Sequence, residues 1–159
     1  MSSRLDTIAD GMVAALGAAT VTTDKGVTYT KPSGLTVGRS RTIPLSPDVL
    51  PQQVVYFVDE EVEAGPGRSI GRVSRRKARF CVETRIDAAS DTTDQALDPF
   101  KSWSVKALCA DPRRAGLAHD TTELGSVWDA VEQDKVYAAL RQLFLVEYVT
   151  SASDPDAAT

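Results

Sequence analysis

Four carboxylates stand close together in the middle of the chain, and carboxylates at short spacing can hold a divalent cation. They are Asp59, Glu60, Glu61 and Glu63. Calcium loops take their oxygen ligands from positions of fixed spacing, and this segment has no EF-hand spacing. The four acids also directly follow an apolar run. The sequence therefore favours a solvated or ion-paired strand end over a metal site.

A basic block follows the acidic one, with six cations within twelve residues. If the two blocks lie on neighbouring antiparallel strands, they pair within the chain and add little stability at the surface. If they face outward, they form a head-to-tail charge pattern between identical subunits, which sets register and orientation more than affinity. The block could also be a solvated hairpin tip. Its members, which we take with the four acids as candidates for a subunit interface, are Arg68, Arg72, Arg75, Arg76, Lys77 and Arg79.

Groups for nucleophilic or zinc chemistry are few. His119 stands in a Leu-Ala-His-Asp loop, and we interpret it as an ordinary loop histidine and not as a general base. Cys81 and Cys109 lie on different expected elements, so we interpret both as small buried apolar residues and not as zinc ligands. The glycines at 65–71 lack the Gly-Lys-Ser/Thr ending of a phosphate loop and predict a turn. The sequence thus predicts no catalytic residue, metal site or cofactor.

Length and composition limit the class of protein. The 159 residues, 42% hydrophobic and 25% charged, predict one globular domain over 1–150 and a small flexible tail over 151–159. The net charge of −4 argues against a general nucleic-acid or anionic-membrane binder. No apolar run approaches the roughly 20 residues of a membrane span, and the first residues do not resemble a secretory signal. Two cysteines provide no disulfide framework, so we expect synthesis in a reducing cytoplasm.

The first half of the chain predicts one helix and several strands. Apolar residues recur at spacings of three and four from Leu5 to Leu16, which predicts an amphipathic helix that ends near Gly17. A weak strand pair should turn at Asp24–Gly26, within a long loop or arm over about 20–52. The apolar run 54–58 predicts a strand covered on both faces.

The second half predicts a hairpin, two helices and a last strand. Hairpin arms are expected at 69–74 and 78–86 around a turn at Arg75–Lys77, with Phe80 and its alternate neighbours buried. Asp98 and Pro99 should cap and begin a helix that ends at 111–112. We expect a loop over 113–125, a short helix through Trp128, and an interior strand over 142–150. Together these elements predict an α+β fold, a mostly antiparallel sheet with helices packed on one face.

Several short segments share an order and spacing with one known family. They are Arg4, Ile8 and Leu16 on the first helix; Leu50-Pro51 before the run 54–58; the segment 76–83; Asp98-Pro99-Phe100 with Trp103; Ala107-Leu108 and Gly116-Leu117; the segment 143–150; and Asp154-Pro155. This pattern resembles the tail terminators, also called tail completion or minor tail proteins, of siphophages, prophages and gene transfer agents.

The resemblance implies a structural virion protein of the tail and neck, made and assembled in the host bacterial cytoplasm. Such a protein has no catalysis and forms a ring, expected to be a hexamer, that caps the tail tube and stops its growth. Its partners would be further copies of itself, the tail tube protein and the head connector or stopper protein. DNA would only pass through the lumen, and no membrane is involved.

Two alternatives stay open. The chain could be a head-closure or adaptor protein of the neck, which also forms rings. It could instead be a small binding module outside phages, or a hydrolase that uses the carboxylates at 59–63.

Charge segregation favours assembly: residues 1–87 carry 12 basic and 10 acidic side chains, a balance of +2, and residues 88–159 carry 6 and 12, a balance of −6.

Overall fold

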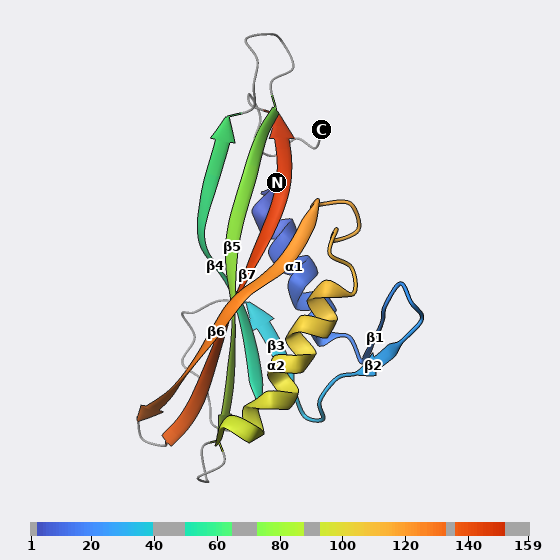
Figure 1. Ribbon diagram of the computed structural model, residues 1–159. Helices are drawn as coiled ribbons and strands as arrows, with labels where there is room; N and C mark the ends of the chain where they lie inside the picture. The colour runs from blue at the N-terminus through green and yellow to red at the C-terminus, as the bar shows by residue number, and fades with distance from the viewer. Residues whose placement is uncertain (1–2, 40–49, 65–72, 88–92, 133–135, 152–159) are drawn as a thin grey trace.

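The computed structural model describes residues 3–39, 50–64, 73–87, 93–132 and 136–151. Two helices and seven strands occur in this part of the chain, which confirms the α+β class (Figure 1). In chain order they are α1 (Arg4–Gly17), β1 (Thr20–Thr22), β2 (Thr28–Thr30), β3 (Thr36–Arg39), β4 (Gln52–Ala64), β5 (Val73–Asp87), α2 (Thr93–Cys109), β6 (Asp120–Glu132) and β7 (Val136–Ser151).

Four long strands form the body of the molecule. The main sheet has the order β3-β4-β5-β7-β6, and all neighbours are antiparallel except β3 and β4. Both helices pack on the same face of this sheet, as predicted (Figure 1). The core lies between them and the inward side chains of β5 and β7, among them Phe80 and Phe144, which are fully buried. Among the described residues, the opposite face of the long strands carries no helix, and we call it the helix-free face.

Helix α1 agrees with its prediction. Ser3 caps it, because its hydroxyl accepts a hydrogen bond of 3.1 Å from the backbone N–H of Asp6. Ile8, Met12 and Leu16 are fully buried against the sheet.

Helix α2 begins earlier than predicted. It starts at Thr93 and contains Pro99 in its interior, although proline has no N–H to bond the carbonyl of Gln95. Leu97, in the turn before the proline, is buried with Ile86 and Leu140 in a second small core. The packing of Leu97 against the sheet explains why the helix extends past the sequence signal. Further along, Trp103 is buried and donates a 3.0 Å hydrogen bond to the carbonyl of Leu16, which ties α2 to α1.

The predicted hairpin turn at Arg75–Lys77 is wrong. Strand β5 runs without interruption from Val73 to Asp87, and its cations pair across to β4 and β7. The block of like charges resembled a solvated turn, but Arg76, Lys77 and Arg79 each form an ion pair with a carboxylate of β4. The alternation over 80–86 is correct, since Phe80, Val82, Thr84 and Ile86 are all buried. The predicted turn at 65–71 lies outside the described residues.

The predicted loop over 113–125 and the short helix through Trp128 are also wrong from Asp120 onward. This segment is strand β6, which pairs with β7 along its whole length. Without β6, the outer N–H and C=O groups of β7 would have no partners. Strand β7 is the predicted interior strand, extended to Val136–Ser151.

Between α1 and β4, the chain is more regular than a long loop. The hairpin of β1 and β2 confirms the predicted strand pair and projects away from the body (Figure 1). Strand β3 was not predicted; it pairs in parallel with Gln52–Val55 of β4. Arg39 at its end forms ion pairs with Asp6 and Asp10 of α1, each at 2.8 Å. The predicted tail at 152–159 lies outside the described residues.

Candidate assembly interface

The acidic and basic blocks lie on neighbouring strands, β4 and β5, and three pairs form between them. Arg79 bonds Asp59, with 2.6 Å from Nε to Oδ1, and Lys77 bonds Glu63 at 2.6 Å; all four side chains are exposed or half-exposed. The hydrogen bond from Arg79 lowers the pKa of Asp59 below its ordinary value. These contacts agree with the interpretation in which the blocks pair within the chain.

The third pair is mostly buried near the start of α1, where Arg4 lies over the ring of Tyr148. Arg76 donates from Nη1 to Glu60 at 2.7 Å and from Nε to the Thr150 hydroxyl at 3.0 Å. The Tyr148 hydroxyl donates a short hydrogen bond to Glu60, and burial together with this bond raises the pKa of Tyr148. The side chains of Arg76 and Glu60 are only 18% and 14% exposed. Two of the interface candidates therefore belong to a network inside the subunit.

The remaining candidates have different positions. Glu61 and Arg75 lie exposed on β4 and β5, and their role between subunits stays a prediction. Arg68 and Arg72 lie outside the described residues.

A second buried charge lies on the helix-free face. Glu83 of β5 is 3% exposed and accepts hydrogen bonds from Arg85 at 2.5 Å and from Arg141 of β7 at 3.0 Å. Burial alone would raise the pKa of Glu83, but the bonds from Arg141 and Arg85 outweigh burial and hold that pKa below its ordinary value. The sequence analysis did not single out this residue.

The Glu83→Gln substitution should destabilise the chain by about 2 kcal/mol at pH 7, because Arg85 and Arg141 are left close together without their carboxylate. A lowered pKa stabilises the folded state above the pKa of the unfolded chain, near 4.5, and this stability is lost as the pH falls through the folded value. Urea unfolding at pH 7 and pH 3 should therefore show a smaller difference between Glu83→Gln and wild type at pH 3 than at pH 7. Glu61→Gln, an exposed control, should follow the wild type at both; a constant difference for Glu83→Gln would contradict the assignment.

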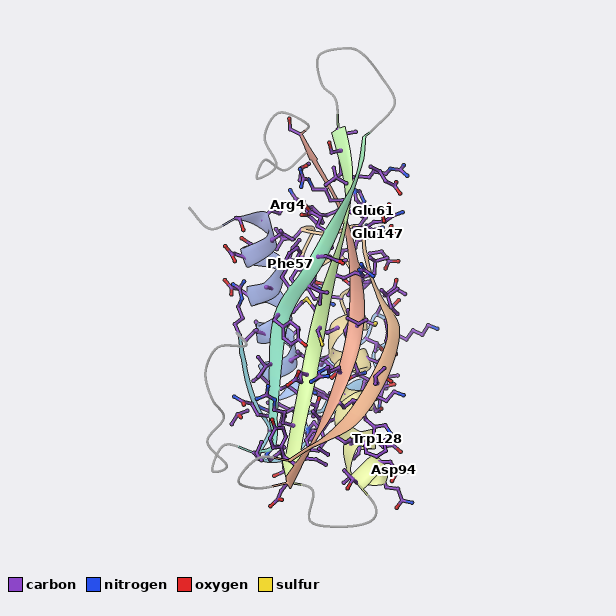
Figure 2. All side chains as sticks on the ribbon, turned by 90° about the vertical axis from the view of Figure 1, so that its left-hand side faces the viewer. Arg4, Phe57, Glu61, Asp94, Trp128 and Glu147 are labelled. Carbon is purple, nitrogen blue, oxygen red and sulfur yellow. The ribbon has the colours of Figure 1, made fainter. Side chains whose placement is uncertain are left out.

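Large apolar side chains gather on the two open edges of the sheet. Among the described residues, β4 has no partner strand beside residues 56–64, and β6 has none beyond β7. We call these stretches the β4 edge and the β6 edge. Figure 2 shows Phe57 and Trp128 at opposite edges of the sheet. Eight large apolar side chains of the described part are exposed, and six of them lie on these edges, 44–70% exposed: Phe57, Val58 and Val62 on the β4 edge, and Leu124, Val127 and Trp128 on the β6 edge.

A hollow lies on the helix-free face between the two edges. It has a volume of about 680 Å³, with Cys81 and Leu143 between walls that include Val58 and Leu124. Bulges in β4 and β6 occur on either side of it, between Phe57 and Asp59 and between Glu123 and Gly125. The prediction that the run 54–58 is covered on both faces is therefore correct for Val54 and Val55 and wrong for Phe57 and Val58.

The residues considered for catalysis or metal binding are dispersed. His119 lies exposed before β6, where its backbone N–H donates to the carbonyl of Glu147. Cys81 is buried as predicted, whereas the prediction that Cys109 is buried is wrong, because it lies exposed at the end of α2. No group of three metal-ligating side chains occurs among the described residues. In the same part of the chain, neither helix is long and apolar enough to cross a membrane.

The chain was compared with protein families, curated proteins and solved structures. No family model matches the chain, and no curated protein matches it. Among solved structures, a chain from the virion of a native gene transfer agent particle is similar over 91% of this chain and 90% of that one, with a TM-score of 0.36 and 16% identity. The function is therefore inferred from the surfaces of the chain itself.

The β6 edge was missed because its apolar residues have two periodicities. Trp128 and Val131 are three apart, as on a helix, while Val127 and Trp128 lie on opposite faces of a strand. The useful signal was the density of β-branched and aromatic residues in Val127–Val131, which favours a strand.

Proposed function

We propose that this chain is a structural virion protein that forms a ring and acts as a tail terminator. The ring would cap the tail tube, stop its growth and join the tail to the head connector. One observation carries the proposal beyond the resemblance of the sequence: the exposed large apolar residues gather on two opposite sheet edges. Exposed, apolar, unpaired edges promote uncontrolled association unless a partner covers them.

A ring covers both edges in every copy. The two edges are different surfaces, so a contact between them is heterologous, and heterologous contacts generate a closed ring when the rotation closes. The expected partners are other copies of the chain, the tail tube protein and the head connector or stopper protein.

The charges of the helix-free face suit a surface past which DNA only moves. Four of its cations, Lys77, Arg79, Arg85 and Arg141, each bond a carboxylate of the same face, Glu63, Asp59 or Glu83, and a fifth, Arg75, lies opposite Glu63. Paired cations attract phosphates less than free ones, because the neighbouring carboxylate repels the phosphate.

Loss of the gene in a particle-producing host tests the role. A terminator predicts overlong tails on filled heads, seen by electron microscopy. Unfilled or leaking heads with tails of normal length would contradict this role and favour the head-closure alternative. For the hydrolase alternative, Glu61→Gln would have to abolish a measurable turnover without changing the oligomeric state.

A further inference from the structure

The directions of the four long strands determine how one copy can meet the next. Along β4-β5-β7-β6 every neighbouring pair is antiparallel, so β4 and β6, three steps apart, run in opposite directions. If a second copy continues the same sheet, its β4 lies antiparallel to the β6 of the first. Neighbouring strands therefore stay antiparallel across the junction, and the strand directions allow a ring of any number of copies to close.

We propose that the copies join by backbone pairing of the β6 edge of one with the β4 edge of the next, which closes the sheets into one continuous barrel. This inference rests on the proposed ring. The occupant of each edge is a second copy of this chain. Three features favour a second copy as the occupant: the direction of the strands, the position of β3 and the offset between the two edges.

Strand β3 restricts where the neighbour can lie. It covers β4 at Gln52–Val55, so only residues 56–64 are open to a partner. The middle of β6 is Ser126. Across the sheet Ser126 pairs with Gln142, Gln142 pairs with Val82, and Val82 pairs with Val55 of β4, so Ser126 and Val55 lie at the same height. The middle of the β4 edge is Glu60. Because the bulge between Phe57 and Asp59 adds one residue to β4, Val55 and Glu60 are four ladder positions apart, and a neighbour must be displaced by about four residues along the strands, or ~14 Å.

This displacement gives a strand tilt that a barrel can use. Each copy adds four strand spacings, about 19 Å in width. A displacement of ~14 Å over that width corresponds to strands tilted by ~36° from the axis, within the usual range of about 35–45° for closed barrels. Without tilt, the same displacement would build an open spiral instead of a ring.

The pairing also brings apolar side chains together. Phe57 lies opposite Phe80 of β5, and Trp128 lies opposite Leu140 of β7, so both are on the helix-covered face; with Glu60 beside Ser126, they meet across the junction. Pairs of aromatic and β-branched residues across neighbouring strands stabilise sheets. The helices need more circumference than the strands, as in other barrels with an outer ring of helices, so the helix-free face lines the channel.

Cysteine cross-linking tests the pairing in the full-length chain. Cys109 is exposed and is first changed to Ser, while Cys81 is buried and stays. Phe57→Cys is then combined with Trp128→Cys, or Val62→Cys with Ser126→Cys, all on the helix-covered face, and the protein is oxidised with diamide. We expect a ladder of covalent oligomers on a denaturing gel with at least one combination. Each single variant should stay monomeric on that gel.

Four results would overturn the proposal, and they differ in what they say of the ring. Covalent dimers from Ser126→Cys or Trp128→Cys alone would mean that two β6 edges pair with each other. Two outcomes would exclude edge pairing and leave the proposed ring standing. In the first, native oligomers form but neither combination gives a ladder. In the second, the control Val62→Cys with Val27→Cys, on the β1–β2 hairpin, gives a ladder as well. A chain that is monomeric before oxidation at every concentration, even with tail tubes present, would exclude both.

Discussion

Replacing Arg76 by methionine should lower the free energy of unfolding by about 3 kcal/mol, because Glu60 then stays buried without its cation. Arg76 and Glu60 lie near the start of α1 together with Tyr148, and the tyrosine hydroxyl alone cannot balance a carboxylate charge. Urea unfolding followed by tryptophan fluorescence measures the change.

Two matched variants separate this effect from a general loss of charge. Arg79→Met removes a cation from the same strand whose ion pair with Asp59 is exposed, so its unfolding curve should nearly coincide with that of the wild type. Adding Glu60→Gln to Arg76→Met should recover part of the loss, because a buried neutral amide costs less than a buried unpaired charge. Equal destabilisation by Arg76→Met and Arg79→Met would show that the position of Arg76 in the network has no special role.

Replacing Val127 by lysine should weaken assembly of the ring by about one order of magnitude, equivalent to about 1.4 kcal/mol per contact, because a cation on the paired edge takes the place of an apolar side chain. Val127 is 70% exposed in the single chain, so folding of the subunit should be unchanged. Natural sheets use lysine in this way to prevent pairing of their edges. Light scattering across a concentration series gives the dissociation midpoint.

The control for this variant is Val27→Lys on the β1–β2 hairpin. Val27 is also large, apolar and exposed, but it lies on neither edge. It should leave assembly unchanged. If both lysine variants dissociate the ring equally, or if neither does, the β6 edge is not the contact between copies.

The sequence predicted local structure well where periodicity and burial agree. Helix α1 follows from the spacing of Ile8, Met12 and Leu16, and the alternation of Phe80 and Val82 identifies the buried face of β5. The prediction from sequence failed where a contact between distant segments determines the secondary structure. The packing of Leu97 extends α2 past Pro99, and pairing with β7 makes a strand of the segment around Trp128. Neither partner is visible within a short window of sequence.

The candidate interface was predicted from the most conspicuous charges, and the fold shows why this was incomplete. Opposite charges on Glu60 and Arg76 are sixteen positions apart in the chain, and antiparallel pairing of β4 with β5 brings them together inside one subunit. The exposed apolar residues of the edges become recognisable only when the order of the strands is known. Single residues such as Val62 and Val127 are unremarkable in the sequence.

Native mass spectrometry of the full-length chain, with negative-stain images of the same sample, tests the central claim most directly. The account predicts one closed oligomer, expected to be a hexamer, visible as a ring with a central channel, and its loss in the Val127→Lys variant. A chain that stays monomeric at every concentration, even with tail tubes present, would contradict it.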